Sequence, residues 1–201
     1  GQAGRAAAYF CLHRTPRLRN LFDPIFTIPM VLPPTVCGFV LLFICGSKTA
    51  FGRFFINIGF PLIFSWPATV IAAVVVAFPL MYRTARGAFE SFDRTLAYSG
   101  QTLGLSNTYI FWRIRMPACR QGILAGTVLA FARALGEYGA TSMIAGYTPG
   151  RTATISTTVY QLWRTNDDGL AFKWVMVNLA ISFVVLLAVN LLEKRRGKEA
   201  G

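Results

Sequence analysis

The chain has 201 residues, of which 54% are hydrophobic and only 14% charged, and its formal net charge is +12. Soluble domains carry about 25% charged residues, so this composition excludes a disordered chain and argues against an ordinary water-soluble domain. The positive charges lie between long uncharged runs rather than on one soluble face, which argues against nucleic acid as a partner.

Apolar runs of about 20 residues, the length that crosses a bilayer, recur along the chain. In chain order we expect a truncated helix at 4–12 and four complete spans, at 24–47, in the second half of 54–82, at 121–150 and at 174–192. The chain begins with glycine and shows no signal peptide, so we expect its natural N-terminus and a first helix to be missing. The pattern predicts an all-α membrane helix bundle, with residues 1–201 forming one transmembrane domain.

Lysine and arginine are unevenly distributed around these spans. Segments 13–23, 83–120 and 193–201 hold thirteen of them, whereas the other side holds six and Arg133 lies within a span. Positive residues are enriched on the cytoplasmic side of membrane proteins. We therefore expect a multi-pass membrane protein with segment 83–120 and the C-terminus in the cytoplasm.

Segment 83–120 is too long for a simple turn and carries helix signals of its own. Asp93 can cap a helix that ends at Gly104, and Ser106 or Asn107 can cap a second helix that Pro117 ends. The segment is too apolar to be a fully solvated loop. Either it packs on its own membrane domain, or one of its helices docks on a cytoplasmic partner protein.

The run AYSGQTLG at 97–104, followed by IRMP at 114–117, resembles the cytoplasmic signature loop of ABC importer permeases. In that family a short coupling helix sits in a cleft of the ATPase subunit. The usual acidic residue before the small pair is absent here, because Ala97 and Tyr98 stand in its place. The resemblance implies that the residues coupling to the ATPase are Ser99, Gly100, Thr102, Leu103, Gly104, Leu105 and Pro117.

Two further blocks resemble the molybdate-type members of that family, namely IPMVLPPTVCGF at 28–39 and LAFARALGEYGAT at 129–141. Sulfate and tungstate permeases share related blocks. The resemblance implies an importer subunit for an oxyanion, with molybdate expected first and sulfate or tungstate as alternatives. It also implies two permeases in the bilayer of the cytoplasmic membrane of a prokaryote, two cytoplasmic ATPase subunits that bind ATP-Mg, and one external binding protein. This chain carries no phosphate-binding loop of its own, so the ATPase reaction is expected on a separate protein.

Arg133 and Glu137 are ionisable residues inside a predicted span, and their spacing places them on one helix face. Because charge inside a membrane is costly, they form either a structural ion pair or part of an oxyanion path. Pro33 and Pro34 predict a kink that is either structural or lines that path. We assign the translocation pathway to Pro33, Pro34, Arg133, Glu137, Gly139 and Thr141.

Other features leave further alternatives open. Gly136 and Gly139 allow either close helix packing or a flexible gate. The hydroxyl-rich segment 152–160 either donates hydrogen bonds to an oxyanion or forms a capped amphipathic surface helix.

A membrane-embedded enzyme and a passive membrane anchor are the two alternatives to transport. The four cysteines form no Cys-x-x-Cys pair and His13 is the single histidine, so we expect no metal site, no cofactor in this chain and no catalytic cluster. A membrane anchor that only tethers a cytoplasmic partner is the remaining alternative, although such an anchor needs neither proline-rich nor charged spans.

Overall fold

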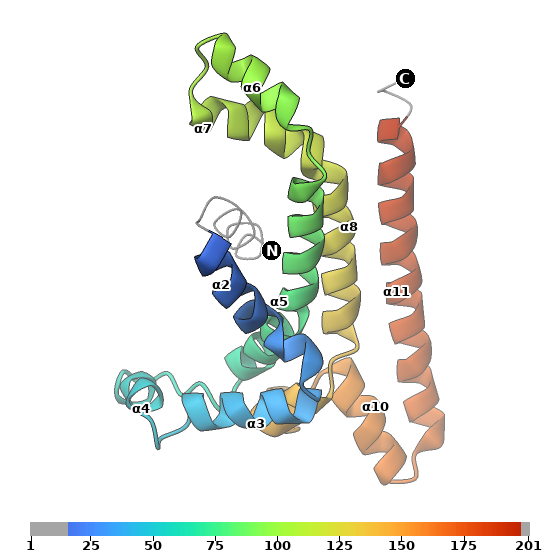
Figure 1. The fold of residues 1–201 in the computed structure, drawn as a ribbon. Helices are drawn as coiled ribbons and strands as arrows, with labels where there is room; N and C mark the ends of the chain where they lie inside the picture. Colours follow the sequence, from blue (N-terminus) through green and yellow to red (C-terminus); the bar gives the residue numbers. More distant parts are fainter. Residues whose placement is uncertain (1–15, 198–201) are drawn as a thin grey trace. The chain divides into compact units, whose positions relative to one another are not determined.

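The computed structural model describes residues 16–197. Over that range the chain is all helical, with one π-helical stretch and no β-strand (Figure 1). The chain divides into two compact units, one made of Gly1–Thr27 and Phe78–Ala130 and the other of Ile28–Ala77 and Phe131–Gly201. The predicted all-α class is confirmed, whereas the helix expected at 4–12 lies outside the described residues.

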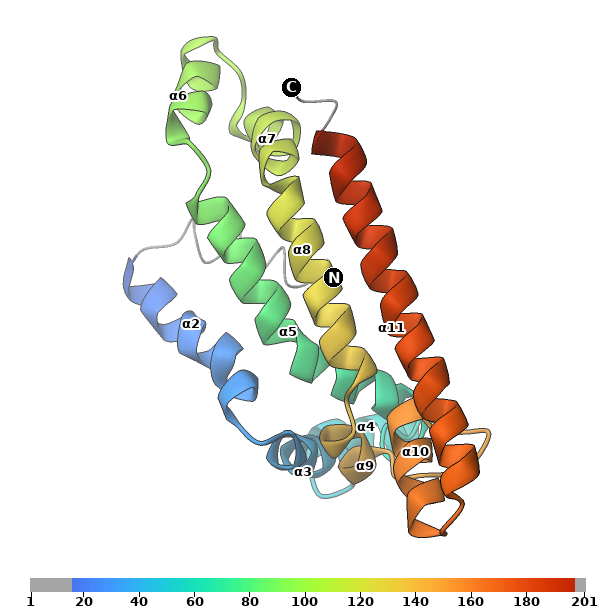
Figure 2. The ribbon, with the colours of Figure 1, turned by 90° about the vertical axis from the view of Figure 1, so that its right-hand side faces the viewer.

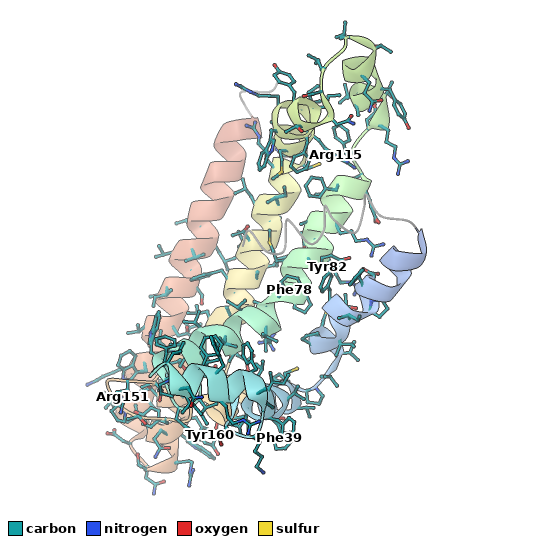
Figure 3. The ribbon with its side chains drawn as sticks, turned by 90° about the vertical axis from the view of Figure 1, so that its left-hand side faces the viewer. Phe39, Phe78, Tyr82, Arg115, Arg151 and Tyr160 are labelled. Carbon is teal, nitrogen blue, oxygen red and sulfur yellow. The ribbon has the colours of Figure 1, made fainter. Side chains whose placement is uncertain are left out.

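The first unit is centred on the packing of α5 (Trp66–Glu90) against α8 (Met116–Leu135). Small residues let the two backbones approach: a Cβ added to Gly122 would lie 2.5 Å from the Cβ of Ala88. Phe26, on α2 (Pro16–Val31), packs edge-on against Phe78 and Tyr82 of α5, with ring centroids 5.5 and 5.3 Å apart. Phe78 and Tyr82 are labelled on α5 in Figure 3. The core of this unit consists of Met81, Tyr82, Ala85, Phe89, Phe92, Cys119 and Ile123.

The same unit contains two short helices, α6 (Arg94–Thr102) and α7 (Asn107–Ile110). A π-helical segment, η1 (Phe111–Arg115), then connects α7 directly to α8. The expectation that Pro117 ends the second helix is therefore wrong, because Pro117 is the second residue of α8. Proline clashes with the carbonyl four residues back in a regular α-helix, and the wider π-turn before it changes that register.

The second unit contains α3 (Pro34–Cys45), α4 (Ala50–Asn57), the first half of α5, α9 (Gly139–Ile144), α10 (Ile155–Arg164) and α11 (Asp168–Gly197). Helix α3 packs against α9, and α10 packs against α11 (Figure 2). The core between α3, α5 and α9 consists of Cys37, Cys45, Leu62, Ala68, Ala72, Val76, Ala140, Ile144 and Ala145.

Two helices of the described residues are long and apolar enough to cross a membrane, Trp66–Glu90 and Asp168–Leu187. The pair Phe22–Val31 and Pro34–Cys45 makes a third candidate, but the two helices are bent by 117° at the break between them. The expectation of one straight span at 121–150 is wrong, since α8 ends at Leu135 and α9 is a separate short helix.

Candidate functional site

Helix α6 begins and ends as its sequence predicts. The carboxylate of Asp93 accepts a hydrogen bond of 2.9 Å from the backbone N–H of Thr95. Hydrogen bonds from the Thr95 side chain and backbone lower the pKa of Asp93 below its ordinary value. After the helix, Gly104 has a φ of +76°, a left-handed conformation that strains any residue with a Cβ. Both predicted boundaries of α6 are confirmed.

The small-residue pair on α6 has one buried and one exposed member. Gly100 is buried, and a Cβ added to it would lie 3.1 Å from Cγ1 of Ile110, so α6 sits close to α7 at this point. The hydroxyls of Ser99 and Thr102 donate to carbonyls of their own helix, at 2.9 and 2.8 Å. Six of the seven predicted coupling residues thus lie together on α6 and the turn after it, and Pro117 lies apart on α8.

Large apolar side chains on these short helices are exposed. The exposed fractions are 50% for Leu96, 59% for Tyr98, 78% for Leu103 and 61% for Trp112. These four side chains, here called the α6 surface, are left uncovered by residues 16–197, the part of the chain that the structure describes. Such a surface is typical of a protein–protein contact.

The second candidate site is the break between α8 and α9. Arg133 Nη1 lies 2.8 Å from Glu137 Oε2, so the predicted ion pair is present. The other carboxylate oxygen of Glu137 accepts a 2.7 Å hydrogen bond from the backbone N–H of Ala140 in the first turn of α9. The Glu137 side chain is 2% exposed, whereas that of Arg133 is 36% exposed. One buried carboxylate therefore links the end of α8 to the start of α9.

Helix α3 contacts α9 beside this ion pair. A Cβ added to Gly139 would lie 3.0 Å from the Cβ of Pro34 and 3.1 Å from the backbone N of Thr35. A Cβ added to Gly38 would lie 2.7 Å from the Cα of Ala140. Close helix packing, one of the two alternatives for Gly139, is thus present.

The structure brings most of the predicted pathway residues together. Pro34, Glu137, Gly139 and the buried Thr141 lie in or beside the contact of α3 with α9. Pro33 lies at the start of α3, where its carbonyl accepts hydrogen bonds from the next turn. Arg133 reaches the same place through Glu137.

The hydroxyl-rich segment 152–160 forms a capped helix rather than a set of free hydroxyls. Thr154 caps α10 in a reciprocal capping box with Thr157. Thr152 is buried and accepts a hydrogen bond of 3.0 Å from the N–H of Thr148. Ser156 donates to the carbonyl of Leu135 at 3.1 Å, which ties α10 to the end of α8. These contacts match the capped-helix alternative.

A polar network in the first unit was not predicted. Tyr82 donates a 2.9 Å hydrogen bond to Asp23, and Arg86 pairs with both Asp23 and Glu90. The Arg86 and Glu90 spacing of four residues was readable from the sequence. Little in the sequence indicates a role for Asp23, because the partners of its carboxylate lie 59 or more positions away along the chain.

Comparison with known proteins identifies the family. Residues 3–198 match the family described as "Binding-protein-dependent transport system inner membrane component". The chain belongs to this family. It is an ABC importer permease and a multi-pass membrane protein, and the predicted family is confirmed.

Three relatives illustrate the similarity. The permease is 40% identical over 173 residues to YvgM of Bacillus subtilis, covering 86% of this chain and 76% of that protein. It is 38% identical over 185 residues to the molybdenum transport system permease protein ModB of Escherichia coli, covering 91% and 81%. It is 31% identical over 179 residues to the sulfate transport system permease protein CysW of Synechocystis, covering 89% and 65%.

Proposed function

We propose that this permease passes molybdate from an external binding protein into the cytoplasm, driven by ATP hydrolysis on a separate ATPase subunit. The single observation that carries the substrate is the similarity to ModB along 91% of the chain. Tungstate and sulfate are the alternatives, since they are also tetrahedral dianions and a sulfate permease is among the relatives.

The α6 surface supports the proposed coupling to an ATPase. Its exposed leucines and aromatic residues need a cover, because apolar area in water costs about 25 cal/mol per Å². An ATPase subunit that binds ATP-Mg would provide that cover, contacting Ser99, Thr102, Leu103 and the turn at Gly104. The working assembly is two permeases in the bilayer, two ATPase subunits and one binding protein, with segment 83–120 and the C-terminus in the cytoplasm.

The proposed cycle uses alternating access. Closure of the ATPase dimer on ATP moves α6, and α7 and η1 transmit that motion because they run without a loop into α8. Helix α8 ends at the break beside Glu137, where four of the six proposed pathway residues gather. The path is proposed to pass Pro33, Pro34, Arg133, Glu137, Gly139 and Thr141. Pairing with Glu137 neutralises Arg133, so a passing anion is not held too tightly to leave.

The test uses the permease with its cognate ATPase and binding protein in liposomes. ATP hydrolysis and uptake are recorded with molybdate, tungstate or sulfate at equal concentration. We expect stimulation by molybdate and tungstate and none by sulfate. Stimulation by sulfate alone would refute the substrate, and no response to any of the three would refute the oxyanion importer.

A passive anchor is the alternative from another class. It predicts that the ATPase still binds, while substitutions at Pro34 and Arg133 leave uptake unchanged. If the protein is an importer, both variants should show reduced uptake while the ATPase remains bound. The amount of uptake per bound ATPase therefore distinguishes the two functions.

A further inference from the structure

A cavity of about 400 Å³ lies in the first unit, between the end of α5, helix α6, and the α7 and η1 segment. Its polar and charged lining residues are Glu90, Arg94, Tyr98, Gln101, Asn107 and Arg115. Neither the predicted coupling residues nor the translocation pathway includes the cationic groups of this cavity.

Arg115 is held in the cavity by aromatic rings. Its guanidinium carbon lies 5.7 Å from the ring centroid of Phe89 and 5.5 Å from that of Phe92. The Nε atom is buried and has no hydrogen-bond partner in the described part of the chain. Aromatic faces stabilise the charge, but they leave a planar set of N–H donors that fits a carboxylate.

The charges around the cavity are predominantly positive. Arg94 and Arg115 are both cationic, and Glu90 is the one carboxylate that residues 16–197 contribute to the lining. Glu90 is already paired with Arg86, at 2.9 Å. The amide of Gln101 donates to Asn107 at 3.0 Å, so those two groups also satisfy each other. An acidic group from outside the chain would complete the site.

One residue, Tyr98, belongs both to the cavity and to the α6 surface. Tyr98 lines the cavity and is also 59% exposed on that surface. A protein that covers Tyr98 on the α6 surface therefore also contacts a residue of the cavity lining. We propose that an acidic side chain of the ATPase subunit enters this cavity and pairs with Arg115. This inference rests on the proposed function, because it takes the ATPase as the protein on the α6 surface.

The first experiment uses Arg115→Lys, which places a primary amine in the cavity and keeps the charge. A carbodiimide joins such an amine to a carboxylate in direct contact, with loss of water, and arginine does not react this way. The purified complex of permease and ATPase is treated, and the cross-linked peptides are identified by mass spectrometry. We expect one cross-link from position 115 to an Asp or Glu of the ATPase, absent from the unsubstituted complex. Arg113→Lys is the matched control, because it lies in the same π-helical segment but is exposed and does not line the cavity.

A second measurement does not depend on the chemistry of lysine. The dissociation constant of the ATPase is measured for permease in nanodiscs at several salt concentrations. We expect Arg115→Gln to raise it tenfold or more and to flatten its salt dependence, while Arg113→Gln changes it less than threefold.

The outcomes separate this inference from the proposed function. If the unsubstituted permease does not bind the ATPase, the proposed coupling fails and this inference fails with it. If the ATPase binds but Arg115→Lys gives no cross-link to it and Arg115→Gln binds equally well, only the inference is overturned. An effect of Arg115→Gln that occurs only in nanodiscs of anionic lipid would also overturn it, because the ligand would then be a lipid headgroup.

Discussion

The buried pair at the α8–α9 break predicts an asymmetric response to substitution. Arg133→Ala leaves Glu137 charged at 2% exposure, with the Ala140 N–H as its remaining partner. Removing one member of a buried ion pair costs about 3–5 kcal/mol, and the remaining hydrogen bond places this case near 3 kcal/mol. Glu137→Gln instead leaves an arginine whose side chain is 36% exposed and therefore not fully buried, and the amide oxygen of the glutamine can still accept a hydrogen bond from the Ala140 N–H. That variant should lose about 1 kcal/mol.

Thermal unfolding in nanodiscs measures this difference. For a chain of this size, 1 kcal/mol shifts the Tm by about 2–4 °C. We therefore expect about 6–12 °C of loss for Arg133→Ala and about 2–4 °C for Glu137→Gln, by the same relation. The double variant should resemble Glu137→Gln alone, because no unpaired buried charge remains in it.

The refuting result is equally specific. If Arg133→Ala unfolds within 2 °C of the unsubstituted permease, a shift worth about 1 kcal/mol or less, the pair does not stabilise the break and the reasoning from burial is wrong. Uptake then distinguishes the two roles left open for the pair. Recovery of uptake in the double variant indicates a structural pair, whereas loss of uptake in both variants that lack Arg133, with uptake retained in Glu137→Gln, indicates that Arg133 itself contacts the anion.

Three further predictions use contacts described above. Gly38→Ala should lose about 1–2 kcal/mol of stability, since its Cβ would overlap backbone atoms of Ala140. The Cβ of Gly87→Ala would meet nothing within 4 Å among the described residues, so this control variant should be neutral or gain up to about 1 kcal/mol. Denaturant unfolding compares the free energies of unfolding of the two variants. Gly104→Arg should abolish uptake while ATP hydrolysis by the ATPase continues. Gly104→Ala must adopt the same positive φ but adds only a small side chain, so it should retain most uptake. Equal uptake in the alanine and arginine variants would contradict a close contact of the ATPase with this turn. Folding lowers the pKa of Asp93. The stabilisation of α6 by the Asp93 carboxylate is therefore complete above the unfolded pKa of about 3.9, and it is lost as the pH falls through the lower pKa of the folded state. Asp93→Asn should remove that acid-induced loss of helicity, measured by circular dichroism, because asparagine caps without titrating.

Local signals in the sequence were sufficient for α6. Its N-cap at Asp93 and its end at Gly104 depend on atoms within three residues, and both were predicted correctly. The start of α7 at Ser106 was one of two predicted caps, for the same reason. The exposure of Leu103 was consistent with a docking helix but could not be told from the sequence, because it depends on what the rest of the chain covers.

Long-range contacts decided what the sequence could not. Hydropathy joined 121–150 into one span, whereas the chain breaks after Leu135, where the Glu137 carboxylate caps α9. That arrangement depends on α3, whose Gly38 lies against Ala140 across a separation of about a hundred residues. The ion pair itself was predicted from its spacing of four residues. The sequence did not predict that Glu137 is buried while Arg133 is partly exposed, and this difference decides how much stability each substitution costs.

The π-helical segment Phe111–Arg115 fixes the rotational register of this part of the chain. A π-turn holds about one residue more than an α-turn, and each residue of an α-helix turns the chain by about 100°. Removing one residue here and restoring a regular α-helix would rotate α7, and with it the partner of Gly100, by roughly that angle about the axis of α8. The length of this segment should therefore be far less tolerant of insertion or deletion than its composition, even at positions such as Arg113 that are exposed to solvent.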